Sequence, residues 1–316
     1  GRRGAVGGRG GRAGGGGEER GDVAANAAPV DLSDALRESL FEPLDTAVLT
    51  SATLATEDGF GFLRRRLGLG AGLRVREAVH PSPFDYDEQT VVAVPTDLPE
   101  PNAPGDVFDD ATADVVGDLA ALSDGGVFAL FTSYRALRKV AAELRSRRLD
   151  GEWPLFVQGE APRAQLIERF AASGRGVLLG VASFWEGVDV PGEPLRGLVI
   201  AKLPFKVPSE PLTEARTEAI EREGGNAFYD YMLPHAALRL KQGFGRLIRS
   251  RTDRGAVVLL DRRVVEKRYG RYFLETLPPS RVRTGDWSEL RAELAGFYRP
   301  APAGSAVRAG GGRGSA

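Results

Sequence analysis

Cysteine is absent from this 316-residue sequence, and histidine occurs only at positions 80 and 235. The missing cysteines exclude a disulfide framework, a thiolate zinc site and an iron–sulfur cluster built by these residues. Two histidines argue against a histidine-built metal site. No apolar run reaches the roughly 18 residues that a membrane span needs, and the start has no signal-peptide core. We expect a soluble, cytoplasmic protein without membrane contact.

The sequence also lacks an excess of either charge, because 42 basic and 43 acidic residues leave a net charge of −1. This total gives no support for a nucleic-acid partner, but it does not exclude a local basic groove. Only five of the basic residues are lysines, and none of them follows a glycine. A phosphate loop of the Gly-Lys-Ser/Thr type is therefore missing from the sequence. The only Asp-Glu pair, Asp87-Glu88, lies in a proline-rich stretch and makes no convincing magnesium site.

Glycine- and arginine-rich tails at 1–30 and 301–316 have almost nothing to bury and are expected to be disordered. Between them, short aliphatic runs alternate with amphipathic helices, which indicates an α/β fold with a parallel sheet covered on both faces. Strands are predicted at 47–49, 90–94, 127–131, 155–157, 177–181, 198–201 and 256–260, and helices at 31–41, 134–144 and 162–172. Ligands bind such sheets at the carboxyl ends of the strands, so we expect the functional motifs there.

The octapeptide at 242–249, Gln-Gly-Phe-Gly-Arg-Leu-Ile-Arg, carries the strongest functional signal. On one continuous helix, Gln242, Arg246 and Arg249 would project from the same face. Gly245 has no side chain and would let another surface approach closely. Two guanidiniums and an amide form a donor array suited to phosphate oxygens. The ordinary alternative is a solvated arginine face.

A second signal follows the predicted strand at 177–181, where residues 183–192 read Ser-Phe-Trp-Glu-Gly-Val-Asp-Val-Pro-Gly. The carboxylate of Asp189, next but one to Gly187, could accept hydrogen bonds from ribose hydroxyls or hold one of the arginines. The Phe184 ring could stack on a nucleobase, or it could anchor the loop to the core. Glu186 could equally be a solvated charge.

Small hydroxyl-bearing residues follow the predicted strands at 47–49 and 127–131. The first group comprises Thr50, Ser51 and Thr53, and the second comprises Thr132 and Ser133 with the adjoining Tyr134. The first group is by itself typical of a turn. The second group opens a helix, where it could cradle a phosphate or supply an ordinary N-cap.

Taken in order, the segments TSATL, PSPFDYDEQ, FTSY, SFWEGVDVPG, KLPF and QGFGRLIRS resemble the C-terminal part of the DinG family of ATP-dependent DNA helicases, relatives of the XPD helicases in superfamily 2. The resemblance runs from about Leu32 to about Pro279. It implies two RecA-like domains that grip ATP between them. The implied organisation is the end of the first domain at 31–78, an interdomain linker at 79–105 and the second domain at 106–300.

The resemblance also implies a role for each motif. Arg249 resembles the arginine finger, with Arg246 and Gln242 beside it on the nucleotide. The remaining implied nucleotide contacts are Gly187, Asp189, Gly245 and Glu186. The implied nucleic-acid contacts are Thr132, Ser133, Tyr134, Ser183 and Phe184, and the implied coupling residues are Thr50, Ser51 and Thr53.

ATP and Mg²⁺ are the implied cofactors, single-stranded or forked DNA is the implied partner, and we expect a monomer that acts in DNA repair or replication. An arginine finger adds a large factor to phosphoryl transfer only when a phosphate is held in front of it. Because the phosphate loop and the acidic magnesium motif are missing, we expect a helicase fragment that is inactive alone. The alternative is a catalytically inert nucleic-acid-binding or interaction module with a RecA-like fold.

Overall fold

The computed structural model describes residues 28–70, 72–181, 184 and 195–299. The chain forms two compact units that are interleaved in sequence. The described part of the first unit comprises 28–83, 203–245 and 263–279, and that of the second comprises 84–202, 246–262 and 280–299, apart from the gaps just given.

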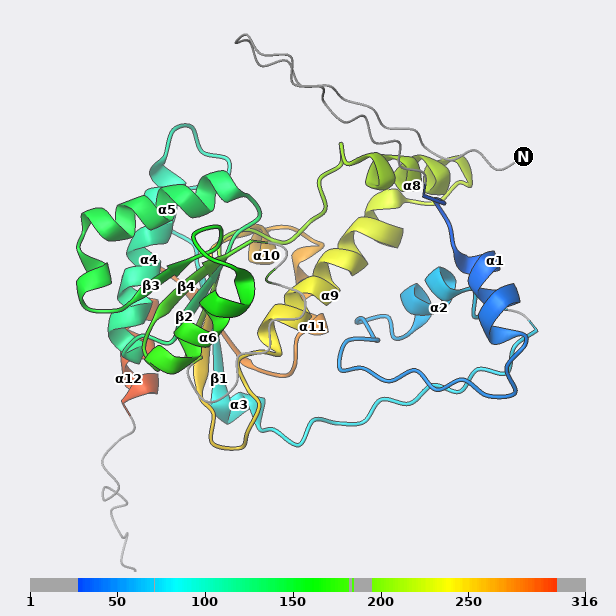
Figure 1. Ribbon diagram of the computed structural model, residues 1–316, viewed down its shortest axis with the longest axis horizontal. Coiled ribbons are helices and arrows are strands. Elements are labelled where there is room, and N and C mark those ends of the chain that lie inside the picture. The colour runs from blue at the N-terminus through cyan, green and yellow to red at the C-terminus, as the bar shows by residue number, and fades with distance from the viewer. Residues whose placement is uncertain (1–27, 71, 182–183, 185–194, 300–316) are drawn as a thin grey trace, which may run out of the picture. The chain divides into compact units, whose positions relative to one another are not determined.

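The second unit is built on a parallel sheet in the order β3-β4-β2-β5-β6-β1-β7 (Figure 1). Its strands are β1 (Thr90–Pro95), β2 (Val127–Leu130), β3 (Leu155–Val157), β4 (Val177–Gly180), β5 (Gly197–Ile200), β6 (Gly255–Leu259) and β7 (Arg281–Gly285). Its helices are α3 (Tyr86–Gln89), α4 (Val107–Ser123), α5 (Tyr134–Ser146), η2 (Leu149–Gly151), α6 (Arg163–Ser173) and α12 (Trp287–Tyr298). The α/β parallel-sheet prediction is confirmed.

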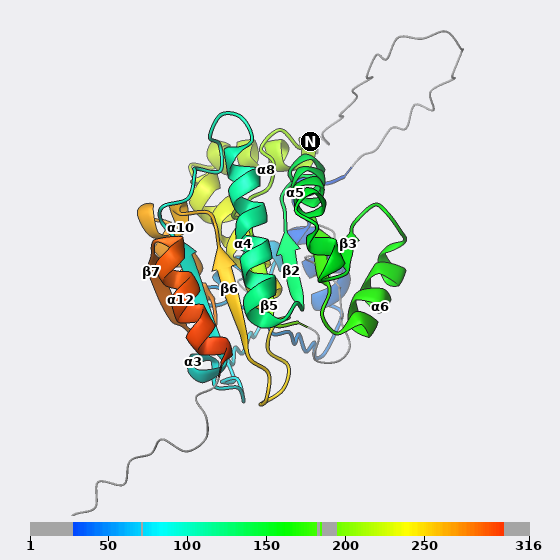
Figure 2. The ribbon, with the colours of Figure 1, turned by 90° about the vertical axis from the view of Figure 1, so that its left-hand side faces the viewer.

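Successive side chains of a strand point to opposite faces of the sheet. Because both sets are apolar here, helices cover both faces. Val127 and Ala129 of β2 share one core with α4, α5 and α12, and two of these helices, α4 and α12, lie in front of the strands in Figure 2. Phe128 points to the other face and meets the Phe184 ring edge-on at 6.3 Å. On that same face Phe170 of α6 packs against Phe156 of β3. The site residues that follow these strands therefore stand on a rigid, two-sided scaffold.

Six of the predicted strands are confirmed, and the seventh is wrong. The 47–49 segment is irregular rather than a strand, and Val48 is 81% exposed. The strand predicted at 90–94, within the range assigned to the linker, is β1, and it pairs with both β6 and β7. β7 was not predicted, since its Arg-Val-Arg-Thr-Gly sequence is an exposed edge strand that needs no aliphatic run.

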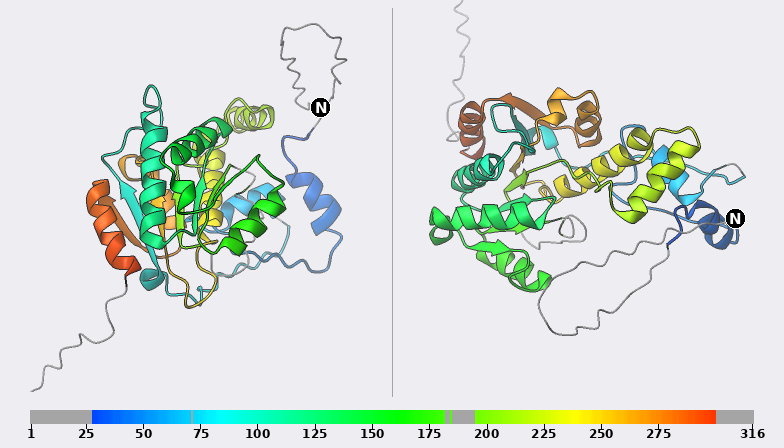
Figure 3. Two further views of the ribbon diagram at one scale, coloured as in Figure 1. Left: turned by 60° about the vertical axis from the view of Figure 1, so that its left-hand side comes forward. Right: turned by 90° about the horizontal axis from the view of Figure 1, so that it is seen from above.

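The first unit is mainly helical in its described part. Its elements are α1 (Ser33–Leu36), η1 (Arg37–Phe41), α2 (Gly61–Leu67), α8 (Pro211–Arg222), η3 (Phe228–Met232), α9 (Leu233–Phe244), α10 (Arg263–Glu266) and α11 (Gly270–Thr276). The helix predicted at 31–41 is present as α1 and η1, and α1 lies beside α2 (Figure 3). Phe205 of the KLPF segment contacts three aromatic rings, those of Phe228, Tyr269 and Phe273.

His235 of α9 makes the stability of the first unit depend on pH. Burial, followed by the charges of Lys206, Arg239, Arg66 and Arg216, lowers the His235 pKa to about 3. In the unfolded chain the imidazole takes up a proton near pH 6.5. Between these pH values the unfolded state binds the extra proton, so stability falls as the pH falls below 6.5.

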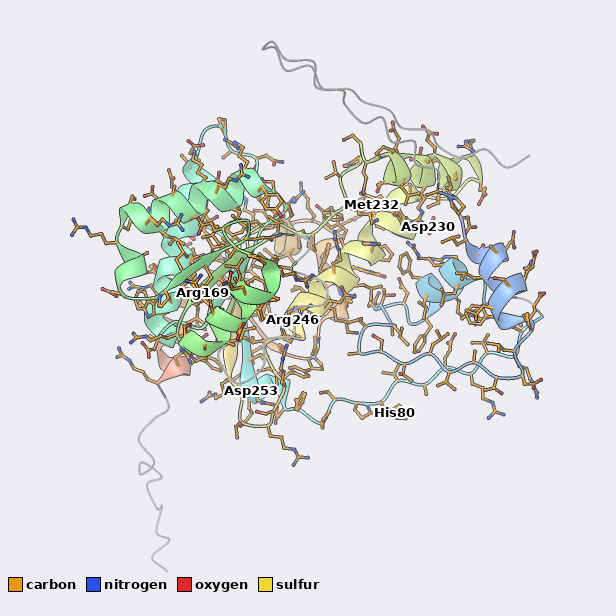
Figure 4. The ribbon with its side chains drawn as sticks, in the orientation of Figure 1. His80, Arg169, Asp230, Met232, Arg246 and Asp253 are labelled. Atoms are coloured by element: carbon orange, nitrogen blue, oxygen red, sulfur yellow. The ribbon has the colours of Figure 1, made fainter. Side chains whose placement is uncertain are left out.

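We expect the free energy of unfolding to be about 1–2 kcal/mol lower at pH 5 than at pH 7 through this group. His235→Leu should remove that part of the difference, as measured by urea unfolding at the two pH values. His80, which is exposed and labelled in Figure 4, provides the control His80→Leu. An unchanged pH dependence in His235→Leu would contradict the assignment.

Candidate nucleotide and nucleic-acid site

The segment after β2 presents polar groups at the carboxyl edge of the sheet. Thr132, Ser133 and Tyr134 are all exposed. Ser133 is the N-cap of α5, and its hydroxyl accepts the backbone N–H of Ala136 at 3.3 Å. The N-cap prediction is therefore confirmed, and it leaves the neighbouring hydroxyls facing solvent at the start of a helix, where an anion is favoured.

Gln158 follows β3 at the same edge and was missed by the sequence analysis. Its Oε1 accepts the backbone N–H of Val181 at 2.7 Å, and its Nε2 donates to the Tyr134 hydroxyl at 2.7 Å. One side chain thus joins the ends of β3 and β4 to the start of α5. A polar residue directly after a buried strand was the available signal, but its two partners lie 23 and 24 residues away.

Phe184 is a core residue, so its prediction as a nucleic-acid contact is wrong. Its side chain is 1% exposed and packs on Phe128, with the Arg163 guanidinium 5.4 Å from the ring centre. A Cβ built at Gly180 would stand 2.8 Å from the Phe184 Cβ, so the end of β4 must be glycine for the ring to seat here. The other predictions in this motif, Ser183, Glu186, Gly187 and Asp189, lie outside the described residues.

The arginines of the 242–249 motif do not share a helix face. Helix α9 ends at Phe244, so Gln242 lies in the helix, Gly245 caps it and Arg246 lies in the turn beyond. Arg249 follows two consecutive residues, Leu247 and Ile248, that are each 2% exposed. The prediction that Gln242, Arg246 and Arg249 project from one helix face is therefore wrong, because the helix ends before the first arginine.

The loop at 245–253 is held by Asp253 and Gln89, neither of which was predicted. The Asp253 carboxylate accepts the backbone N–H groups of Arg249 at 2.7 Å and Ser250 at 2.8 Å, and the Ser250 hydroxyl at 2.6 Å. The Gln89 amide donates to the carbonyls of Ser250 and Asp253, both at 2.8 Å. Figure 4 shows Arg246 and Asp253. Arg249 itself is exposed.

Asp253 is a stable anion in this setting. Burial raises the pKa of its carboxyl, but the hydrogen bonds from Ser250 and from the backbone of Arg249 and Ser250, with the charge of Arg249, lower it below the ordinary value overall. The clamp formed by Asp253 and Gln89 also fixes the position of the loop in the second unit. Gln89 directly precedes β1 and Asp253 closely precedes β6, so the clamp lies at the amino edge of the sheet. The expectation that every motif lies at the carboxyl edge is wrong for this loop.

The Thr50 group lies in an exposed, irregular segment of the first unit. The backbone N–H of Thr53 donates to the Ser51 hydroxyl at 3.2 Å, which is typical of the turn that the sequence also allowed. Shortly afterwards, Ala55 accepts a hydrogen bond from the Lys241 ammonium of α9 at 3.2 Å. Burial lowers the pKa of Lys241. This contact joins the segment after the TSATL motif to helix α9, which leads into the loop at 245–253.

Among the described residues, no group of three or more histidine, cysteine or acidic side chains could hold a metal ion. Within this part of the chain, no helix is long and apolar enough to cross a membrane. The described site is therefore one of hydroxyl, amide and guanidinium donors. Such donors are suited to phosphate and sugar oxygens.

The parallel sheet with helices on both faces defines a RecA-like domain. A solved XPD helicase shares this fold with a TM-score of 0.58, at 16% identity, over 81% of this chain and 46% of that one. The helicase C-terminal domain family matches residues 116–280, just over half of the chain. The chain belongs to this family.

Two curated relatives agree with that assignment. The ATP-dependent DNA helicase YoaA of Escherichia coli is 37% identical over 258 residues, which cover 82% of this chain and 39% of YoaA. The 3'-5' exonuclease DinG of Bacillus subtilis is 38% identical over 277 residues, which cover 87% of this chain and 30% of DinG. The predicted resemblance to DinG-type helicases is confirmed, and the chain spans well under half the length of either relative.

Proposed function

We propose that the chain works as the C-terminal motor domain of an ATP-dependent DNA helicase of the DinG type. The family match and the name of the YoaA relative support this proposal. The observation that carries it is the arginine loop at 245–253. There the backbone on either side of Arg249 is fixed by Asp253 and Gln89, while the Arg249 side chain is exposed.

A fixed loop suits an arginine that must meet a phosphate. Hydrogen bonds already order the backbone, so little conformational entropy is lost when the guanidinium binds an anion. Arg249 is the proposed finger, and the further proposed nucleotide contacts are Gln242, Arg246, Gly187, Asp189, Gly245 and Glu186. ATP bound with Mg²⁺ would supply the transferable phosphoryl group, and the guanidiniums of Arg249 and Arg246 would neutralise the negative charge that develops on it.

The carboxyl edge of the sheet is the proposed path of the DNA strand. Thr132, Ser133, Tyr134 and Ser183 are the proposed contacts to its sugar-phosphate backbone, and Thr50, Ser51 and Thr53 are proposed to couple nucleotide state to the strand. Single-stranded or forked DNA bound by a monomer fits this arrangement. The arginine loop lies at the opposite edge, so each surface can be tested without changing the other.

DNA binding is testable on the chain itself because the proposed strand contacts need no ATP. Arg138 lies on α5, exposed, with its guanidinium 5.9 Å from the centre of the Tyr134 ring. We expect the chain to bind a fluorescent 20-nucleotide oligo-dT, and Arg138→Gln to weaken binding about threefold to tenfold at low salt. The slope of log affinity against log salt should fall by about one.

Arg291→Gln, on an exposed arginine of α12, is the matched control and should leave the affinity unchanged. Equal losses in both variants would indicate non-specific charge attraction, and absence of binding by the unaltered chain would overturn the proposed DNA site.

A further inference from the structure

Gln158 occupies a position that neither the family roles nor the sequence pattern assign. Its Oε1 accepts from the Val181 backbone N–H, and its Nε2 donates to the Tyr134 hydroxyl, both at 2.7 Å. The backbone of Gln158 is itself held, because its N–H donates to the Leu179 carbonyl at 3.0 Å. Both ends of the side chain are therefore tied to elements of the rigid sheet and helix.

The direction of each bond follows from the chemistry of the partners. A backbone N–H can only donate, so the amide oxygen must face Val181 and the amide nitrogen must face Tyr134. The Tyr134 oxygen then accepts, and its own proton remains available to donate to a further acceptor. Gln158 thus fixes the position of the Tyr134 hydroxyl and makes its oxygen the acceptor of this bond.

The surroundings of Tyr134 identify the kind of acceptor. The residue is 44% exposed, and the Arg138 guanidinium lies over its ring. The N-terminus of α5 begins at this residue, after the Ser133 cap. A hydroxyl donor, a guanidinium and a helix N-terminus together favour an anionic oxygen, as in the phosphates of a nucleic-acid strand.

We propose that Gln158 is a positioning residue for strand binding: it holds the Tyr134 hydroxyl toward a backbone phosphate of single-stranded DNA and ties it to the end of β4. This inference rests on the proposed DNA site. It adds a specific coupling, in which Gln158 affects strand affinity through the position of the Tyr134 hydroxyl. A purely structural Gln158 would affect folding stability and would leave strand affinity unchanged well below the melting temperature.

The experiment is a double-mutant cycle on the full chain, with oligo-dT affinity measured by fluorescence anisotropy. Tyr134→Phe keeps the ring and removes the hydroxyl, and Gln158→Met keeps the length of the side chain and removes both hydrogen bonds. We expect each single variant to weaken binding about threefold to tenfold, the range of one typical hydrogen bond. The double variant should bind no more weakly than either single variant, because both changes remove the same proposed contact of the Tyr134 hydroxyl with the strand.

Gln165→Met, on an exposed glutamine of α6, is the matched control and should bind like the unaltered chain. Melting temperatures recorded for every variant separate binding from folding. Normal affinity in Gln158→Met, or a double variant whose losses multiply, would overturn the role of Gln158 while leaving the DNA site intact. Failure of the unaltered chain to bind would overturn the DNA site and the inference together.

Discussion

Replacing Arg249 by alanine is expected to lower the rate of ATP hydrolysis about a thousandfold once a phosphate is held in front of the arginine loop. An arginine finger neutralises charge that develops on the phosphoryl group in the transition state, and its removal costs roughly 10³–10⁵ in turnover. The sequence has no phosphate loop, so the assay uses the chain fused behind a RecA-like domain that carries one, with magnesium and single-stranded DNA.

The same loop provides the control. Arg251 is exposed two residues further on, and Arg251→Ala should hydrolyse ATP at the unaltered rate. Arg249→Lys keeps the charge but loses the planar fork, so we expect it to recover only a small part of the activity. Since Arg249 is exposed, its variants should melt like the unaltered protein. Equal turnover in Arg249→Ala and Arg251→Ala would contradict the finger and favour the catalytically inert nucleic-acid-binding module.

Asp253→Ala is expected to have the largest effect on stability of any polar substitution at the site, about 2–3 kcal/mol in the free energy of unfolding. It leaves two backbone N–H groups and the Ser250 hydroxyl without their acceptor, each a loss on the order of 1 kcal/mol. Chemical denaturation measures the loss. Asp253→Asn keeps an acceptor oxygen and should lose about half as much.

Asp114 of α4 provides a matched aspartate whose replacement by alanine should change little. Its carboxylate is exposed and pairs with Arg147, and such surface pairs contribute about 0–1 kcal/mol. If Asp253→Ala were as stable as Asp114→Ala, the clamp would not hold the loop. In the ATPase fusion, Asp253→Ala should also lower turnover, because it frees the backbone that carries Arg249.

The pH dependence of the clamp has a definite sign. Because the Asp253 pKa is lowered in the folded state, the stability that its charge contributes is fully present above the unfolded value of about 3.9. It is lost as the pH falls through the lower folded value. Between pH 7 and pH 5 the clamp should therefore contribute constantly, whereas His235 lowers stability over that interval.

The sheet was largely predictable from the sequence because burial on both faces leaves aliphatic runs at β2, β4, β5 and β6. The exposed edge strand β7 carries no such run and was missed. The opposite error occurred at 47–49, where an aliphatic run is exposed. An apolar run shows that a segment can be buried, but burial also needs a partner that covers it.

The site was predicted in its residue types but only partly in its geometry. The Arg249 motif was found, but the helix predicted to carry it ends at Phe244, and hydrogen bonds to Asp253 and Gln89 hold the backbone beyond. The Gln89–Asp253 clamp joins residues 164 positions apart, and no local pattern shows such a contact. The sequence allowed Phe184 either to stack on a nucleobase or to anchor its loop to the core. Its contact with Phe128 shows that it packs in the core.

Hydrogen–deuterium exchange of the chain with and without oligo-dT tests the DNA site most directly. We predict that the oligonucleotide slows exchange at 131–136 and 157–160, which bear the Tyr134–Gln158 pair at the carboxyl edge, and leaves 263–279 of the first unit unchanged. Protection that is confined to other segments, or exchange that is unaffected by saturating oligonucleotide, would contradict the proposal that this edge of the RecA-like sheet binds the strand.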